Sequence, residues 1–379
     1  MKKRCICGIT TASSDYDLLK NVFSRFNEDN KVEFYLLIAG SHLSKQYGYT
    51  IKNIYNSNFN KIKLINTLSS GDSRKSMSYS ISNGIKKFSK VFYDLKADAI
   101  ILLGDRYEAL SASIAAKVLN VKIIHFSGGD TTKGSLDDYF RYNISSLSDF
   151  HFVKLPKHKT NLSKYKIDKK NIDVIGSLNL ENVNKMKKMT LSHINKRFNT
   201  KITKPFALVS FHSSTNPKSK NDNNVRVLLK SFNKNKKMFY VFTTANADFG
   251  GKKINSIIRK WTKKNYRNSA FVENFGGDYY LNLINLCKCM IGNSSSGIVE
   301  SGYFEKPVIN ILPRQKGRDK NINVIDVNNN AQAISKAVNK AISKKFKKKC
   351  EKMKDIFKVM KSYKISNYVY SRIKALKFI

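Results

Sequence analysis

The chain has 379 residues, of which 41% are hydrophobic and 11% are aromatic. A disordered chain carries far fewer apolar residues, so this composition predicts packed cores. The length exceeds that of one ordinary α/β domain and predicts two domains.

Lysine and arginine total 70 against 27 aspartate and glutamate, a formal net charge of +43. Such an excess attracts any polyanion. The lysines are nevertheless scattered along the chain, and no arginine-rich arm, zinc finger or aromatic RNA-binding signature accompanies them. We interpret the charge as a solvated surface that favours anionic substrates, and we expect no specific nucleic-acid site.

The cysteine spacing and the hydropathy pattern bear on compartment and metals. Cys5-x-Cys7 and Cys287-x-Cys289 lack the spacing of a zinc site, so we expect no metal. The apolar stretch near the start ends at Ser13, too early for the core of a signal peptide. No apolar run reaches about 18 residues, the length of a membrane-spanning helix. Reduced thiols and these absences predict a cytoplasmic protein.

Short apolar runs alternate with amphipathic stretches in the first half, a pattern typical of βαβ units and a parallel sheet. Helices are expected at residues 70–95 and 106–119. The expected strands are residues 4–9, 33–39, 99–104, 121–126, 151–155 and 172–176.

The alternation restarts after a polar stretch at residues 182–204, expected to be a helix and a linker. We therefore predict a first domain at residues 1–181, a second at 205–330 and a basic helical segment at 331–379. The expected fold is α/β, with two Rossmann-like doubly wound sheets facing a central cleft, as in glycosyltransferase-B enzymes. The strands of the second domain are expected at residues 206–211, 238–243, 270–273, 289–292 and 308–311.

Polar residues follow two strands of the first half. Asp105 and Arg106 come after the strand at 99–104, where an aspartate can transfer protons and an arginine can bind phosphate. An N-capping aspartate beside a surface arginine is the alternative. Asp130, Asp137 and Asp138 follow the next strand, and crowded carboxylates separate one another's pKa values as acid–base roles require. An acidic turn is the alternative here.

The second half carries residues suited to phosphate. His212 follows a strand, and the Gly- and Ser-rich stretch at residues 292–297 predicts a helix N-terminus able to bind phosphate. Glu300 on that helix could bind a ribose diol, and Arg314 and Arg318 add two guanidinium groups. A serine-capped helix without a ligand is the alternative.

Read in order, these motifs resemble those of the hydrolysing UDP-N-acetylglucosamine 2-epimerases, which supply N-acetylmannosamine-type sugars for sialic and legionaminic acid synthesis. Each motif alone is weak, but seven in the same order make chance similarity improbable. They are residues 40–50, 104–110, 125–138, His212, Asn246, 292–300 and 312–318.

The resemblance implies site residues, a UDP-amino sugar as ligand, a homodimer or homotetramer, and no cofactor. Proton transfer falls to the first domain and UDP binding to the second. The implied catalytic residues are Asp105, Asp130, Asp137 and His212, and the implied substrate-binding residues are Arg106, Asn246, Ser294, Ser295, Ser296, Glu300, Arg314 and Arg318.

Three positions depart from the family pattern. Ser13 replaces an arginine, Ser127 replaces a glutamate of some relatives, and Asp130 is shorter than the usual glutamate. UDP-N,N'-diacetylbacillosamine is therefore an alternative substrate to UDP-N-acetylglucosamine. A UDP-sugar transferase of the same fold and a basic nucleic-acid-binding protein are alternatives of other classes.

Overall fold

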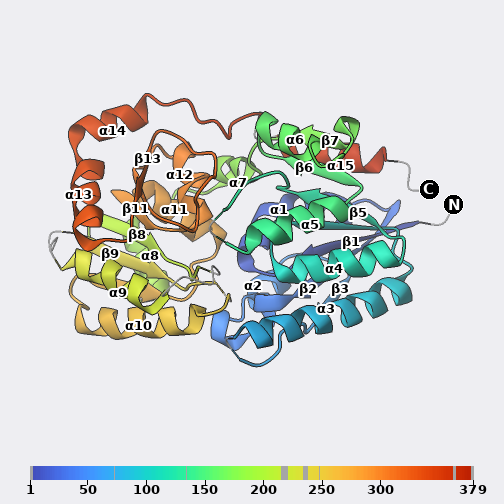
Figure 1. Ribbon diagram of the computed structural model, residues 1–379, viewed down its shortest axis with the longest axis horizontal. Coiled ribbons are helices and arrows are strands. Elements are labelled where there is room, and N and C mark those ends of the chain that lie inside the picture. Colours follow the sequence, from blue (N-terminus) through green and yellow to red (C-terminus); the bar gives the residue numbers. More distant parts are fainter. Residues whose placement is uncertain are drawn as a thin grey trace. The chain divides into compact units, whose positions relative to one another are not determined.

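The computed structural model describes residues 3–71, 73–133, 135–214, 221–233, 238–246, 248–361 and 364–376. The chain forms two compact units, each built from segments distant in sequence (Figure 1). Unit 1 comprises Met1–Asp130, Asp137–Asn184 and Lys358–Ile379, and unit 2 comprises Thr131–Leu136 and Lys185–Phe357.

Unit 1 contains a seven-stranded parallel sheet in the order β3-β2-β1-β4-β5-β6-β7. The central strands are almost entirely apolar because helices cover both faces of such a sheet. The strands are β1 (Arg4–Thr10), β2 (Val32–Ala39), β3 (Ile62–Ile65), β4 (Ala99–Leu103), β5 (Lys122–Phe126), β6 (Phe150–Val153) and β7 (Ile172–Val174). Its helices are α1 (Ser13–Asn27), α2 (Ile51–Tyr55), α3 (Arg74–Leu95), α4 (Tyr107–Val118), α5 (Asp137–Leu147), α6 (Pro156–Ser163), α7 (Asn179–Lys185) and α15 (Ile365–Lys374).

Unit 2 contains a six-stranded parallel sheet in the order β10-β9-β8-β11-β12-β13. The chain's single tryptophan, Trp261, packs against Phe232, Tyr240 and Phe242 beside this sheet. The strands are β8 (Phe206–Ser210), β9 (Phe239–Thr243), β10 (Ser269–Val272), β11 (Cys289–Gly292), β12 (Val308–Ile311) and β13 (Val324–Val327). Its helices are α8 (Leu191–Phe198), α9 (Asn221–Phe232), α10 (Gly251–Lys264), α11 (Gly277–Leu286), the 3₁₀ turn η4 (Ser295–Gly297), α12 (Glu300–Tyr303), α13 (Ala331–Ile342) and α14 (Lys344–Glu351).

The two doubly wound sheets confirm the predicted fold class, and all the expected strands form. Sequence patterning missed only β3 and β13 among the strands described, and both lie at a sheet edge. Each has only four residues and is interrupted by a charged one, Lys63 in β3 and Asp326 in β13, so neither gives a continuous apolar run. Two of the four residues of β3 are also exposed. The domain boundaries expected at residues 181, 204 and 330 stay predictions.

The segment from residue 331, which is expected to be helical, contains more than one helix. The described residues form three helices, α13, α14 and α15. Ser343 separates the first two, because its extended backbone ends α13 and its hydroxyl accepts a hydrogen bond from Phe346 N (3.3 Å), capping α14. The segment is divided between the units, with α15 in unit 1.

Helix α15 is attached to unit 1 by buried and partly buried carboxylates. The buried Glu181 accepts hydrogen bonds from the backbone N–H (3.0 Å) and hydroxyl (2.8 Å) of Ser366. Asp29 accepts from Tyr370 (2.6 Å) and Lys374 (2.8 Å). Figure 1 shows α15 close to α6 and β7, and the helix also packs against α1. These bonds join segments that are distant in sequence.

The attachment of α15 is expected to weaken in acid. Burial opposes ionisation of Asp29, but hydrogen bonds from Lys374 and Tyr370 lower its pKa from 3.8 to about 2. Because the folded pKa is the lower one, Asp29 stabilises the fold above pH 4 and loses this effect as the pH falls towards 2. The difference in free energy of unfolding between wild type and Asp29→Asn should therefore shrink from pH 5 to pH 3. A difference that stays constant over this range would contradict the assignment.

Two further observations concern the whole described chain. None of the helices in the described ranges is both long and apolar enough to cross a membrane. The five cysteines are buried, and none is in a disulfide.

Candidate active site

The loop that follows β4 carries Asp105 and is held in place by a buried histidine on β5. His125 Nε2 lies 2.8 Å from the carbonyl oxygen of Gly104, and its Nδ1 lies 3.1 Å from Ser145 Oγ. Burial lowers the pKa of His125 to about 3, so the ring is neutral at pH 7. A neutral ring bonds both groups when Nε2 donates to the carbonyl and Nδ1 accepts from the serine. His125 thereby fixes Asp105 relative to β5 and α5.

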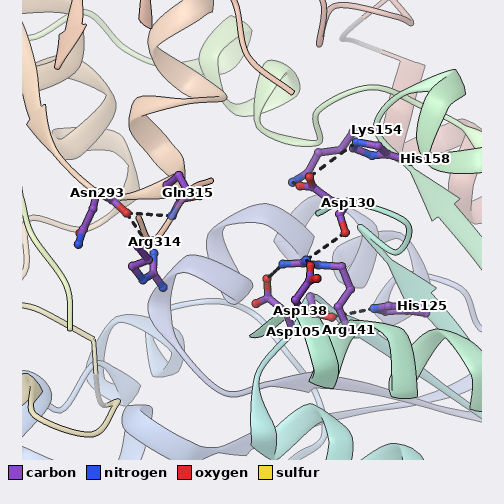
Figure 2. A network of polar contacts seen from close by, with 11 residues as sticks. Asp105, His125, Asp130, Asp138, Arg141, Lys154, His158, Asn293, Arg314 and Gln315 are labelled. Atoms are coloured by element: carbon purple, nitrogen blue, oxygen red, sulfur yellow. Dashed lines mark hydrogen bonds and ion pairs between the residues drawn. The ribbon is translucent and has the colours of Figure 1, made fainter. Parts of the chain in front are cut away.

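Arg141 on α5 lies at the centre of the polar cluster in unit 1 (Figure 2). Its guanidinium, 1% exposed, forms ion pairs with Asp105 and with Asp138 (3.3 Å) and donates to the carbonyl of Asp130 (3.1 Å). Burial alone would lower the pKa of Arg141, but the surrounding carboxylates, Asp105 foremost, raise it above its ordinary value. Arg141 is therefore a fixed positive charge.

Asp130 follows a tight glycine turn and is almost fully buried. Its carboxylate oxygens lie 3.7 Å from Lys154 Nζ and 3.7 Å from His158 Nε2. Gly129 has φ +71°, and a Cβ there would lie 2.3 Å from the carbonyl oxygen of His158. Glycine is thus required for the turn to approach α6 so closely.

The cluster differs in charge from the sequence prediction. The sequence pointed to crowded carboxylates, and the structure adds Arg141, Lys154 and His158 beside them. Asp137, the first residue of α5, adds to the field that raises the pKa of Arg141. Arg141 could have been found from its spacing, because it lies one helical turn after Asp137 and Asp138. Lys154 directly follows β6 and His158 lies on α6, and no local pattern marks either residue.

Arg106 lies in a second buried polar group of unit 1. Its side chain is 11% exposed and pairs with the buried Glu108 (3.2 Å), so the alternative of a surface arginine is wrong. Burial raises the pKa of the neighbouring Asp15. Burial, and then the charge of Arg106, lower the pKa of His42 to about 4. His42, within the motif at 40–50, lies between the hydroxyls of Thr10 (2.8 Å) and Thr50 (2.7 Å).

In unit 2, His212 is fixed by a reciprocal pair of hydrogen bonds with Asn293. His212 N donates to Asn293 Oδ1 (2.7 Å), and Asn293 Nδ2 donates to the carbonyl of His212 (2.9 Å). Asn246 N donates to His212 Nδ1 (3.1 Å). This bond makes Nδ1 an acceptor, so Nε2 carries the ring's proton and can donate to a ligand.

The backbone carbonyl of Asn293 also accepts hydrogen bonds from two side chains of the loop that follows β12. It accepts from Arg314 Nη1 (3.2 Å) and from Gln315 Nε2 (2.8 Å), as Figure 2 shows. Arg314 and Arg318 are both mostly buried. The loops after β8, β11 and β12 are thus bonded into one group at the carboxyl edge of this sheet.

The serine-rich stretch forms a smaller element than expected. In place of a helix beginning at residues 294–297, the structure has the 3₁₀ turn η4 and then the four-residue helix α12, which begins at Glu300. Ser294 caps the turn by accepting from Ser296 N (3.4 Å). A Cβ at Gly292 (φ +143°) would lie 2.0 Å from the carbonyl oxygen of Ser210, so the chain reaches this turn only through glycine.

Several buried polar atoms at the same edge have no protein partner in the described part of unit 2. These atoms are Ser213 Oγ, Thr244 Oγ1 and Gln315 Oε1. Buried polar groups are normally hydrogen-bonded, so such a group of unsatisfied atoms indicates a place for a ligand or ordered water. Over the described ranges, no three His, Cys, Asp or Glu side chains gather as metal ligands.

Two doubly wound parallel sheets with these polar loops define the class, an α/β enzyme of the glycosyltransferase-B fold type. The crystal structure of UDP-GlcNAc 2-epimerase from Neisseria meningitidis bound to UDP-GlcNAc superposes with a TM-score of 0.79 at 15% identity, covering 98% of this chain and 100% of that one. The crystal structure of Methanocaldococcus jannaschii UDP-GlcNAc 2-epimerase in complex with UDP-GlcNAc and UDP superposes with a TM-score of 0.79 at 16% identity. It covers 98% of this chain and 100% of that one.

Sequence similarity gives the family. The family model described as UDP-N-acetylglucosamine 2-epimerase matches residues 24–365. GDP/UDP-N,N'-diacetylbacillosamine 2-epimerase (hydrolyzing) of Campylobacter jejuni is 35% identical, over 89% of this chain and 88% of the relative. UDP-N,N'-diacetylbacillosamine 2-epimerase (hydrolyzing) of Legionella pneumophila is 28% identical, over 87% of each chain. The chain therefore belongs to the UDP-N-acetylglucosamine 2-epimerase family, in its hydrolysing branch.

Proposed function

We propose that the protein cleaves UDP from a UDP-linked 2-acetamido sugar, inverts C2 and releases an N-acetylmannosamine-type product. The observation that carries this proposal is the polar cluster of unit 1 in a chain of this family. Arg141 pairs there with the carboxylates of Asp105 and Asp138, and the carboxylate of Asp130 lies beside Lys154 and His158. Carboxylates held beside fixed cations are suited to proton transfer, because their position and charge are set before the substrate binds.

The chemistry follows from the sugar. The C2 proton of an N-acetylhexosamine is not acidic, so inversion there is expected to pass through elimination of UDP to a glycal. Water then adds across the double bond, with its oxygen on C1 and with C2 protonated on the face opposite to the one that lost the proton. Asp105, Asp130 and Asp137 are the proposed proton-transfer groups. Unit 2 is proposed to bind UDP and stabilise it as the leaving group. The proposed contacts from unit 2 are Asn246, His212, Ser294, Ser295, Ser296, Glu300, Arg314 and Arg318. Arg106 is a further proposed contact, from unit 1.

Two substrates fit the proposal. UDP-N-acetylglucosamine is one, and it is the ligand named for the Neisseria structure. The relatives at 35% and 28% identity are named for diacetylbacillosamine, which favours that 4-amino-6-deoxy sugar as the second. Incubation with each UDP-sugar, without an acceptor, tests both. Release of UDP and a C2-inverted free sugar is expected from at least one, whereas a transferase would need an acceptor and a nucleic-acid-binding protein would release nothing.

Isotopic labelling tests the route of inversion. If UDP leaves by elimination and water then adds to the glycal, the product takes its C2 hydrogen and its anomeric oxygen from solvent. The reaction in heavy water should give a product deuterated at C2, and oxygen-18 water should place the label at C1. Mass spectrometry and NMR measure both labels. Retention of the original C2 hydrogen would exclude the elimination route.

Removing either of two side chains of unit 2 should weaken UDP binding. His212→Ala and Arg314→Ala each remove a group proposed to contact charged phosphate, a contact worth about 1.5 to 3 kcal/mol. Calorimetric titration with UDP measures the loss, and Arg259→Ala is the control because Arg259 pairs with Glu273 at an exposed position. Unchanged affinity in both variants would remove this edge of unit 2 from UDP binding.

A cytoplasmic location and a homo-oligomeric assembly are also proposed. The five buried, unbridged thiols suit the reducing cytoplasm. A homodimer or homotetramer is expected, which light scattering of the purified protein would measure.

A further inference from the structure

A chain of five hydroxyl groups lies beneath the serine-rich turn of unit 2. Thr243 Oγ1, at the end of β9, lies 3.1 Å from Ser210 Oγ, at the end of β8. Ser210 Oγ lies 3.1 Å from the hydroxyl of Tyr280, on α11. The Tyr280 hydroxyl lies 2.7 Å from Ser296 Oγ, which lies 3.2 Å from Ser294 Oγ.

Counting protons shows what this chain can do. Its five hydroxyls have one proton each, and its four contacts use four of them. One hydroxyl therefore does not donate to any of the other four. Every hydrogen bond along the line is donated in the direction of that hydroxyl. An anion bound next to Ser294 would make Ser294 that hydroxyl, and each of the other four would donate towards the turn.

Tyr280 is the middle one of the five hydroxyls, and it favours one direction of hydrogen-bond donation along them. A phenol is a better donor than an aliphatic hydroxyl, and the contact from Tyr280 to Ser296 is the shortest of the four. Burial raises the pKa of Tyr280 to about 12, so its proton stays in place through the neutral range. Tyr280 can therefore accept from Ser210 while donating to Ser296.

We propose that Tyr280 is a positioning residue for the nucleotide's phosphates, which directs the hydroxyls of Ser296 and Ser294 so that Ser294 donates outward to the anion. This inference rests on the proposed binding of UDP by unit 2. Ser296 then accepts from Tyr280 and is kept from turning its own proton away from Ser294. Hydrogen bonds in such a chain polarise one another, so the outer donor is strengthened as well as oriented.

Removal of one oxygen atom tests the inference. Tyr280→Phe preserves the ring and should weaken UDP binding about three- to tenfold, the range of one net hydrogen bond. Tyr279→Phe is the matched control, since Tyr279 is the next residue on α11 and its hydroxyl faces His193 (3.4 Å) outside the chain of hydroxyls. Titration with uridine, which has no phosphate, should give equal affinities for Tyr280→Phe and wild type.

A double-mutant cycle with Ser294→Ala separates positioning from a general loss of structure. If Tyr280 acts through Ser294, the tyrosine substitution should cost nothing further once the Ser294 hydroxyl is gone. Additive losses, equal weakening of uridine, or unchanged UDP affinity in Tyr280→Phe would overturn the inference alone. Failure of wild type to bind UDP would instead overturn the proposed function, and the inference with it.

Discussion

Asp105→Asn is expected to lower kcat by at least about a hundredfold, the effect of losing a general acid or base. The substitution keeps the size of the side chain but replaces the carboxylate beside Arg141 with an amide. The surrounding side chains can therefore stay in place, while residue 105 can no longer accept or donate the proton. Asp130→Asn and Asp137→Asn should have effects of the same order. UDP affinity should change little in all three variants, since the proposed UDP contacts lie mainly in unit 2.

Steady-state kinetics and calorimetric titration with UDP measure the two quantities separately. Asp94→Asn is the control, because Asp94 pairs with Lys90 on the exposed surface of α3. Full activity in Asp130→Asn would show that this shorter residue is not catalytic here, whatever glutamate does in relatives. A large loss of UDP affinity in the aspartate variants would show that these side chains act in binding.

Arg141→Met is expected to reduce both activity and the stability of unit 1. Removing one partner of a buried ion pair leaves the others uncompensated, at a cost of about 3 to 5 kcal/mol. We expect the lower end, because Asp105 and Asp138 are 28% and 20% exposed and water can reach them. The kcat value should fall at least tenfold, since Asp105 loses the group that orients it.

The two units offer separate spectroscopic signals for this variant. Trp261 lies in unit 2, so its fluorescence follows the unfolding of that unit. In Arg141→Met, the part of the circular-dichroism change that comes from unit 1 should move to lower denaturant, while the fluorescence transition of unit 2 stays in place. Arg259→Met, which breaks an exposed ion pair with Glu273, is the control and should move neither. An unshifted circular-dichroism transition in Arg141→Met would contradict a stabilising role.

The parts of the fold that the sequence predicts well are those that depend on local patterning. The strand at residues 99–104 is uninterruptedly apolar because helices cover it on both faces, and its end marks where Asp105 emerges. The break between α13 and α14 is not marked by the apolar pattern, because Ile342 and Phe346 keep a helical spacing across Ser343. The destination of α15 depends on contacts with Asp29 and Glu181, which lie far away in sequence.

The same distinction holds for the candidate site. Asp105, Asp130 and His212 follow apolar strands, so their position at a sheet edge could be predicted. Lys154 and Tyr280 could not be found in that way, because each meets its partner only when separate strands and helices pack together. His158 likewise lies on α6 and meets Asp130, in the loop after β5, only in the folded chain. Electrostatic partners of this kind need the three-dimensional arrangement.

The attachment of α15 has a consequence for synthesis of the chain. Ser366 bonds to Glu181 across 185 positions, and the whole of unit 2 except residues 131–136 lies between them in sequence. On the ribosome, where folding proceeds from the N-terminus, unit 2 is complete before unit 1 receives its last helix. Until then the surfaces of α1 and β7 that α15 covers remain open to water or to chaperones. Unit 1, whose residues emerge first, therefore completes its fold only after unit 2 has been synthesised.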